Sequence, residues 1–254
     1  IKIGSKYPPF IIAEMSANHG GSLSKALKII DMAADSGASA VKIQTYTADE
    51  MTINSTKGGF YIKDKKNIWK GQKLYDLYKG ASTPRKWHKE LFERAKKKNI
   101  ILFSTPFSVQ SVDFLEEFDP PLYKISSFEN NDLELIERVA KTKKPIIVSI
   151  GMASENEVKL IIKTIKKFSK NKIILLKCTS AYPSPFEDLN LKSIDFMKKK
   201  FKCEVGLSDH SIGITAPIVS VVFGATVIEK HFKIDDKGFD AKFSLNPHQF
   251  SECV

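Results

Sequence analysis

Residues 145–178 read PIIVSIGMASENEVKLIIKTIKKFSKNKIILLKC. Two short apolar runs in this stretch, Pro145–Ile150 and Ile173–Cys178, are rich in β-branched residues and predict strands. Between them, Ser154–Phe168 carries apolar residues at the spacing of an amphipathic helix. A strand, a helix and a second strand in this order predict a βαβ unit with parallel strands.

The same alternation of strand and helix extends over the whole chain. The other predicted strands are Phe10–Met15, Ala40–Thr45, Ile100–Thr105, Leu122–Ser126, Glu204–Ser208 and Thr226–Lys230, which brings the number to eight. The other predicted helices are Leu23–Ser36, Pro84–Lys98, Leu133–Thr142, Asn190–Lys200 and Gly213–Phe223. We therefore predict an α/β fold, a single (β/α)8 TIM barrel over residues 1–254, because that fold typically has about 250 residues. A doubly wound open sheet is the main alternative, but no glycine-rich βα turn marks its switch point.

Composition and charge restrict the functional classes. The chain has no uncharged apolar stretch of about 18 residues and no basic region followed by an apolar run at its start, so we expect neither a membrane partner nor a secretory signal. Three widely spaced cysteines, without a CxxC pair, suit a reducing cytoplasm. The net charge of +11 comes from lysine runs that close predicted helices, so we expect anionic small substrates and no nucleic acid.

The segment from Ala48 to Ser82, between the second and third predicted strands, is longer than a usual βα loop. It contains Trp69 and the pair Tyr75 and Tyr78. Long βα loops of barrels are often lids or substrate walls. We therefore expect this segment to face the substrate.

Polar residues stand at or near the carboxyl end of nearly every predicted strand, where a TIM barrel keeps its active site. In chain order they are Glu14, Lys42, Gln44, Thr105, Lys124, Ser127, Glu129, Ser149, Lys177, Ser208, Asp209, His210, Glu229 and His231. A charged residue within a buried strand destabilises the fold unless it is paired or binds a ligand. Together these residues predict a polar pocket of mixed charge.

Two lysines alternate with apolar neighbours and should point into the barrel mouth: Lys42 and Lys124. With the nearby hydroxyls they would form a cradle for a phosphate and a carboxylate. Two alternatives remain open at this point. Each lysine could belong to an ion pair in the barrel interior, or the chain could be a Schiff-base aldolase that uses Lys124 or Lys177.

Two histidines end the last two predicted strand regions: His210 after Gly206–Asp209, and His231 after Ala225–Lys230. Adjacent strands would place their imidazoles side by side, and two imidazoles with water or carboxylate oxygens suit a divalent transition ion. Taken singly, a histidine is more often structural. His19 is a weaker site candidate, and we predict that His88 and His248 lie on the surface.

These residues lie within motifs that resemble the sialic acid synthase family along nearly the whole chain. The motifs are IIAEMSANH, VKIQTYTADEMTI, IWKGQKLYDLYKGASTP, FSTPF, YKISSFEN, IVSIGMAS, LLKCTSAYPSP, VGLSDHSIG and GATVIEKHF. Within the family, AEMSANH, QTYTADEMTI, IWKGQKLYDLY and SSFEN are similar to the pseudaminic acid synthase branch. The resemblance implies an enzyme that condenses phosphoenolpyruvate with an open-chain amino sugar and releases phosphate. For this branch the sugar would be 2,4-diacetamido-2,4,6-trideoxy-L-altrose, with N-acetylneuraminate or legionaminate synthesis as alternatives.

The resemblance also implies roles for individual residues. By this likeness a divalent metal, typically Mn²⁺ with Mg²⁺ or Co²⁺ as alternatives, is held by His210 and His231. Phosphoenolpyruvate is bound by Lys42, Thr105, Lys124, Ser127, Ser149 and Ser208, with Gln44 as a further substrate contact. The sugar or its reacting end meets Glu14, Glu129, Tyr182 and Asp240, and Ser180 stands where the neuraminate branch has an asparagine near phosphoenolpyruvate. Family members usually continue into an antifreeze-like domain that completes the sugar site of a homodimer, whereas this sequence ends at Val254.

Overall fold

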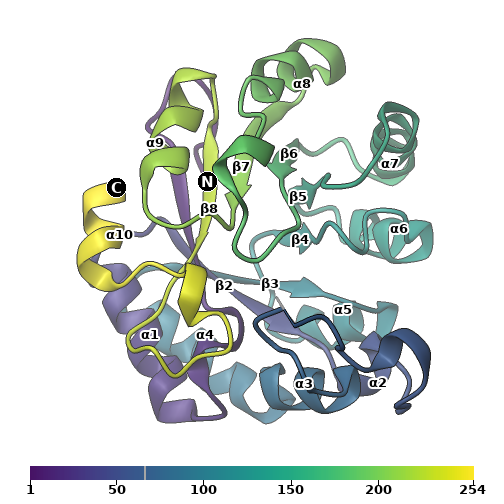
Figure 1. Cartoon of the computed structure of the whole chain (residues 1–254). Coiled ribbons are helices and arrows are strands. Elements are labelled where there is room, and N and C mark those ends of the chain that lie inside the picture. The colour runs from purple at the N-terminus through teal and green to yellow at the C-terminus, as the bar shows by residue number, and fades with distance from the viewer. Residues whose placement is uncertain (66) are drawn as a thin grey trace.

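A computed structural model of the protein describes residues 1–65 and 67–254. Over this part of the chain, eight parallel strands form one closed barrel in the order β1 to β8 (Figure 1). The strands are β1 (Phe10–Glu14), β2 (Ala40–Thr45), β3 (Ile101–Pro106), β4 (Tyr123–Ile125), β5 (Ile146–Ser149), β6 (Ile173–Cys178), β7 (Glu204–Asp209) and β8 (Val227–His231). The predicted (β/α)8 fold is confirmed, and each predicted strand overlaps an observed one.

Helices surround the barrel on the outside (Figure 1). They are α1 (Leu23–Asp35), α4 (His88–Lys97), α5 (Val109–Glu116), α6 (Leu133–Lys141), α7 (Glu155–Phe168), α8 (Ser193–Phe201), α9 (Thr215–Val222) and α10 (Pro247–Cys253). The insertion after β2 adds two short helices, α2 (Ala48–Met51) and α3 (Leu74–Ala81). In the described residues, no helix is both long enough and apolar enough to cross a bilayer.

Two barrel helices, α5 and α10, lie outside the helices predicted from the sequence. Both carry recognisable start signals: the Ser108 hydroxyl accepts a hydrogen bond from the Ser111 backbone N–H at 3.0 Å, and Asn246 forms a capping box with Gln249 before α10. These helices have only 8 and 7 residues, so their apolar periodicity is weak. Helix α10 completes the ring beside α1 (Figure 1).

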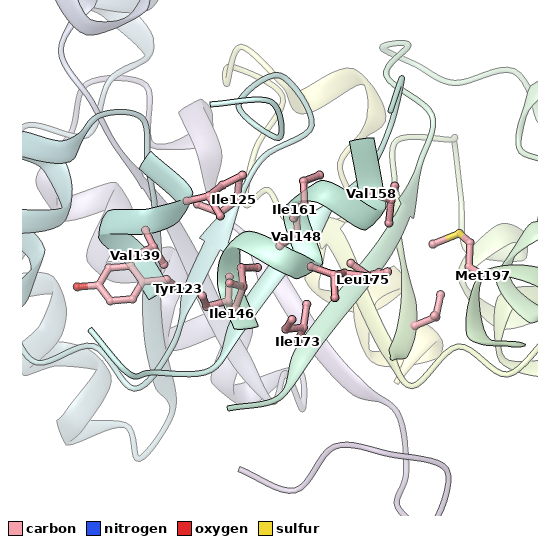
Figure 2. Packing of buried hydrophobic residues seen from close by; sticks show 14 of the residues in the cluster. Tyr123, Ile125, Val139, Ile146, Val148, Val158, Ile161, Ile173, Leu175 and Met197 are labelled. Carbon is pink, nitrogen blue, oxygen red and sulfur yellow. The ribbon is translucent and has the colours of Figure 1, made fainter. Parts of the chain in front are cut away.

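Every second side chain of a barrel strand points into the barrel. Near the amino ends of the strands, an apolar layer fills the interior: Phe10, Ile12, Ala40, Phe103, Leu122, Ile147, Ile174, Leu176 and Val227. The alternate residues point outward and pack under the helices. Figure 2 shows such outward residues, Ile125 of β4, Val148 of β5 and Leu175 of β6, in the same buried cluster as side chains from α6, α7 and α8. This rigid packing fixes the strand ends that carry the polar residues.

Candidate active site

In the described part of the chain, seven strongly buried polar side chains from seven strands lie beyond the apolar layer, at the carboxyl ends of the strands. They continue the inward alternation of the apolar interior residues. All are buried, with exposed fractions between 1% and 4%. They are Glu14, Lys42, Thr105, Lys124, Ser149, Ser208 and Glu229. The fold therefore brings residues from seven different strands to one mouth, as the strand-end pattern predicts.

Lys42 lies in the centre of this polar group. Its Nζ is 2.8 Å from Oε2 of Glu14, donates a hydrogen bond to Oγ1 of Thr105 at 2.9 Å, and lies 3.7 Å from Oε1 of Glu229. Burial alone would lower the pKa of Lys42, but the carboxylates of Glu14 and Glu229 raise it above the usual value. Lys42 is therefore a buried, charged ammonium group at the base of the mouth.

Lys124 and Glu229 form the second ion pair, with 3.2 Å between Nζ and Oε1. The Ser208 hydroxyl also donates to Oε1 of Glu229 at 3.1 Å. Burial would raise the pKa of Glu229, but Lys124 and Lys42 outweigh it and hold this pKa at about 2. Burial lowers the pKa of Lys124, against the opposing effect of Glu229. Both lysines are thus in interior ion pairs and also face the mouth. They can therefore serve as structural ion pairs and as part of a cradle for an anion.

Free hydroxyl groups lie beside the lysines. The Oγ atoms of Ser127 and Ser149 are buried and have no hydrogen-bond partner among the described residues. A Cβ atom at Gly151 would lie 2.9 Å from the hydroxyls of both Ser127 and Ser180, so only glycine leaves space between them. Buried hydroxyls without partners can donate to the oxygens of a bound anion. The Ser127 and Ser149 hydroxyls are in a position to do so, and the half-buried Ser180 hydroxyl lies across Gly151 from Ser127.

The imidazoles of His210 and His231 lie side by side, with ring centroids 5.3 Å apart. His210 directly follows β7, and His231 is the last residue of β8. Nδ1 of His210 lies 3.1 Å from the Thr179 carbonyl oxygen. When Nδ1 donates this bond, Nε2 carries the lone pair that a metal ligand needs. The pairing that the sequence predicts is therefore present.

The donor set fits a divalent metal with two protein ligands. Nδ1 of His231 is buried, lies 3.6 Å from Oδ2 of Asp240, and makes no hydrogen bond within residues 1–65 and 67–254. In the same residues, no group of three or more histidine, cysteine, aspartate or glutamate side chains is arranged to hold a metal ion. A metal held by His210 and His231 would therefore take its other ligands from water or substrate oxygens.

Two further carboxylates stand at the rim. Asp240, in the loop between β8 and α10, accepts a hydrogen bond from the Ala17 backbone N–H at 3.4 Å. Glu129, in the loop after β4, accepts one from the Ser126 hydroxyl. Burial raises the pKa of Glu129 to about 7, which Lys124 only partly opposes. A carboxyl group with this pKa can exchange a proton near neutral pH.

Gln44 is held against Glu14 and not left free in the mouth. Its Nε2 donates to Oε1 of Glu14 at 3.0 Å and to the Ser16 hydroxyl at 3.1 Å. Glu14 is thus tied both to Gln44 and to Lys42.

Aromatic rings cover the side of the mouth next to the histidines. The Tyr182 ring lies 4.5 Å from the ring of His210 and 5.5 Å from that of Phe243, between centroids. Phe243 in turn lies 4.8 Å from His231. Trp69, from the long insertion, packs at 6.0 Å against Tyr182. The insertion therefore does contribute to the wall of the mouth.

Three sequence predictions are wrong. Lys177 lies on the outward face of β6, because Leu176 and Cys178 on either side of it face the interior; its Nζ donates to the Thr179 hydroxyl at 2.9 Å. Asp209 also points outward, where it forms a buried ion pair with Lys230 at 2.5 Å. His88 is fully buried, with Nε2 2.7 Å from Oγ1 of Thr45.

The other two histidines outside the pair differ in burial. The side chain of His248 is 83% exposed, as predicted. His19 is buried with its ring 5.3 Å from Trp87, and its Nδ1 accepts a hydrogen bond from the Gly21 backbone N–H at 3.1 Å. His19 therefore has a packing role beside the first βα loop.

The structure adds Phe243 to the predicted site and gives two predicted residues a definite place: Glu229 as the partner of both lysines, and Trp69 in the aromatic wall. Glu229 precedes His231 by two residues and so shares its side of β8. Trp69 and Phe243 lie in loops, where no periodicity indicates which way a side chain points.

With this geometry established, comparison with known proteins assigns the family. A model described as the NeuB family matches residues 29–254. The chain belongs to the NeuB family. The predicted membership of the sialic acid synthase family is thereby confirmed.

Two curated relatives and one crystal structure are similar to this NeuB-family chain. A pseudaminic acid synthase of Campylobacter jejuni is 51% identical over 247 residues, which are 96% of this chain and 71% of that protein. An N,N'-diacetyllegionaminic acid synthase of the same species is 40% identical over 244 residues, 94% of this chain and 72% of that protein. The crystal structure of an N-acetylneuraminic acid synthetase from Leptospira borgpetersenii, in complex with citrate, has a TM-score of 0.89 and 37% identity, and covers 100% of this chain and 84% of that one.

Proposed function

We propose that this NeuB-family chain is a pseudaminic acid synthase. It condenses phosphoenolpyruvate with 2,4-diacetamido-2,4,6-trideoxy-L-altrose to give pseudaminic acid and phosphate. The observation that carries the proposal is the 51% identity, over 96% of the chain, to a protein of that name. The barrel mouth supports it, because buried lysines and free hydroxyls suit a substrate with a phosphate and a carboxylate.

Phosphoenolpyruvate binds, in this proposal, at the base of the mouth. Lys42 and Lys124 face its anionic groups, and the free hydroxyls of Ser127 and Ser149 donate hydrogen bonds to them. The further contacts come from Thr105, Ser180 and Ser208. Such preorganised donors would hold the methylene carbon toward the sugar, which lowers the entropic part of the barrier.

The sugar aldehyde reacts beside the imidazole pair. We assign a divalent metal, Mn²⁺ first and Mg²⁺ or Co²⁺ as alternatives, to His210 and His231, whose nitrogen donors fit it. Such an ion, when bound, acts as a Lewis acid toward the aldehyde oxygen. Asp240 and Tyr182 would contact the sugar, since both lie next to the histidines. Gln44 and Glu14, which are tied together, would form the adjacent wall.

The reaction proceeds in three bond changes. The methylene carbon of phosphoenolpyruvate forms a carbon–carbon bond with the aldehyde carbon, whose oxygen takes a proton and becomes a hydroxyl. Water then adds to the electron-poor carbon that carries the phosphate. The added water loses one proton and becomes a hydroxyl group on this carbon. Finally the bond from this carbon to the phosphate oxygen breaks and phosphate leaves with the electron pair. The new hydroxyl gives its proton to the departing phosphate, and a keto group remains.

Glu129 is the group we assign to accept the proton of the attacking water. Its pKa is raised to about 7 by burial, so it is ionised only above that pH. We expect kcat/KM for phosphoenolpyruvate to fall as the pH drops below about 7, because the protonated carboxyl cannot accept a proton. The substitution Glu129→Gln should lower kcat by a factor of about 100 to 10,000 and remove this acid limb from the pH profile.

A matched control for this prediction is Glu134→Gln, at an exposed position of α6. It should leave the pH profile of the native protein intact. An acid limb that persists unchanged in the Glu129 variant would assign the titration to another group.

Two alternative activities give different outcomes with the same protein. A legionaminate or N-acetylneuraminate synthase would use another amino sugar, and the identity of 40% to the legionaminic acid synthase makes this the nearer alternative. A Schiff-base aldolase could now use only Lys124, because Lys177 lies outside the barrel. Borohydride reduction in the presence of pyruvate would then leave a covalent adduct on Lys124, which the synthase does not form.

The proposed function is tested by phosphate release from phosphoenolpyruvate. We expect release only when a divalent metal and the altrose derivative are both present, because the carbon–carbon bond must form before water can add. Release without the sugar, or a borohydride-trapped adduct, would contradict the proposal.

We also propose a cytoplasmic homodimer. The three cysteines, Cys178, Cys203 and Cys253, are free thiols, which persist in a reducing compartment. Helix α9 carries no charged residue, and its valines and its one isoleucine are exposed, with 83% for Val222 and 47% for Ile218. In a chain of net charge +11, a second copy can pack on this uncharged apolar face without bringing like charges of the helix together.

The substitution Val222→Lys should shift the dimer toward monomer in analytical ultracentrifugation, because it places a charge within the apolar face. The matched control is Leu160→Lys on α7, a 45% exposed leucine that directly follows Lys159. The control should remain a dimer. A monomeric native protein, or a dimer in both variants, would contradict this assignment of the interface.

A further inference from the structure

Three aromatic rings from three separate loops pack in a row on one side of the mouth. Trp69 and Tyr182 are partly exposed, and the buried ring of Phe243 supports Tyr182 from behind. Trp69 belongs to the insertion after β2, Tyr182 follows β6, and Phe243 follows β8. The ring centroids of Trp69 and Tyr182 are 6.0 Å apart, and those of Tyr182 and Phe243 are 5.5 Å apart. The surface begins at the imidazoles, with Tyr182 4.5 Å from His210, and ends at Trp69.

Trp69 is held in place by one hydrogen bond to another loop and one within its own loop. Its indole Nε1–H donates to the Phe239 carbonyl oxygen in the β8–α10 loop at 3.1 Å. Its own backbone N–H donates to Oδ1 of Asn67 at 2.9 Å. The insertion also meets Phe239 at Gly80, where an added Cβ would lie 3.3 Å from the phenyl ring. The indole is thus fixed by a polar anchor, which leaves its face for packing.

This aromatic surface does not match phosphoenolpyruvate, which is small and anionic and is matched by the lysines on the strand ends. It suits an apolar part of the other substrate. With the aldehyde end of an open-chain sugar at the imidazoles, Trp69 stands at the far end of the surface and meets the last carbon of the chain. In the sugar assigned above, that carbon is a methyl group, because the sugar lacks the hydroxyl at C6.

We propose that Trp69 is a specificity-determining residue whose indole, packed on Tyr182, recognises the C6 methyl group of a 6-deoxy amino sugar. The inference rests on the proposed synthase function and adds the basis of its sugar selectivity. The indole face stabilises a bound methyl group by excluding water. Its one N–H already donates to the Phe239 carbonyl, so the indole offers no hydrogen bond to a hydroxyl at the same place. Apolar contacts of this kind distinguish two substrates by about 10-fold to 100-fold.

The test compares kcat/KM for the 6-deoxy sugar and for its 6-hydroxy counterpart. The native protein is expected to prefer the 6-deoxy sugar by about 10-fold to 100-fold, and Trp69→Ala should reduce this preference to less than about threefold. The KM for phosphoenolpyruvate should remain within about twofold. A matched control is Phe196→Ala on α8, an aromatic residue 48% exposed on the outside of the barrel, which should keep the full preference.

The possible outcomes separate the two proposals. A native protein that does not use the altrose derivative contradicts the proposed function, whereas a Trp69→Ala variant that keeps the native preference contradicts the role of Trp69. If the Trp69→Ala variant no longer binds phosphoenolpyruvate and is therefore misfolded, the Trp69→Phe variant tests the role of Trp69 in its place. The phenylalanine variant keeps an aromatic face and should retain at least about a third of the preference for the 6-deoxy sugar. Complete loss of this preference, in a Trp69→Phe variant with normal phosphoenolpyruvate affinity, would overturn the inference.

Discussion

Replacement of His210 or His231 by alanine is expected to abolish the metal-dependent release of phosphate, with a fall in kcat of at least about a thousandfold. A Lewis acid contributes several kcal/mol to the stabilisation of a developing alkoxide, and about 1.4 kcal/mol corresponds to a tenfold change in rate. The two imidazoles are the protein donors that fit the ion at this place. Loss of either imidazole would leave the ion with one protein ligand.

The histidine variants need a readout that does not depend on catalysis. Calorimetric titration with Mn²⁺ should show binding to the native protein and none to either variant. His248→Ala is the matched control, because the side chain of His248 is 83% exposed, and it should bind and react as the native protein does. The unfolding midpoint verifies that each variant is folded. Full activity in both the His210 and the His231 variant would contradict the metal assignment.

The second large effect is expected for Lys42→Ala and Lys124→Ala, which should weaken phosphoenolpyruvate binding by at least about a hundredfold. A hydrogen bond to a charged group contributes about 1.5–3 kcal/mol. Lys42→Ala also leaves the buried Glu14 carboxylate without its ammonium partner. Lys124→Ala leaves Glu229 with Lys42 alone, at 3.7 Å. In each variant that carboxylate would then repel the incoming anion.

Isothermal titration with phosphoenolpyruvate measures this effect, and Lys177→Ala is its matched control. Lys177 stands on β6 between two inward-facing residues but itself faces outward. Its removal should change the affinity for phosphoenolpyruvate by less than about twofold. Equal affinity in the Lys42 and Lys124 variants and in the native protein would mean that both lysines serve only the interior ion pairs.

The barrel and its polar mouth could be predicted from the sequence because both depend on periodicity. Apolar runs separated by helical patterns located all eight strands, and the alternation within them placed Lys42 and Lys124 inside. The errors at Lys177 and Asp209 came from treating every charged residue at a strand end alike. The same alternation, applied residue by residue, puts both of them on the outward face.

Contacts between loops could not be predicted in the same way. The hydrogen bond from Trp69 to Phe239 joins residues 170 positions apart, and no repeating pattern in either loop indicates it. The sequence predicts a surface position for His88 because helices carry polar residues outward. In the structure its ring packs 5.0 Å from Phe114 and contacts the Thr45 hydroxyl. A buried polar residue of this kind depends on partners from distant elements.

The most direct test of the proposed function is the identity of the keto acid that the protein makes. Purified protein is incubated with phosphoenolpyruvate, Mn²⁺ and either the altrose derivative or N-acetylmannosamine, and the product is identified by mass spectrometry. We expect pseudaminic acid from the altrose derivative, with one phosphate released for each product molecule, and little product from N-acetylmannosamine. Efficient formation of N-acetylneuraminic acid, with no product from the altrose derivative, would contradict the proposed function.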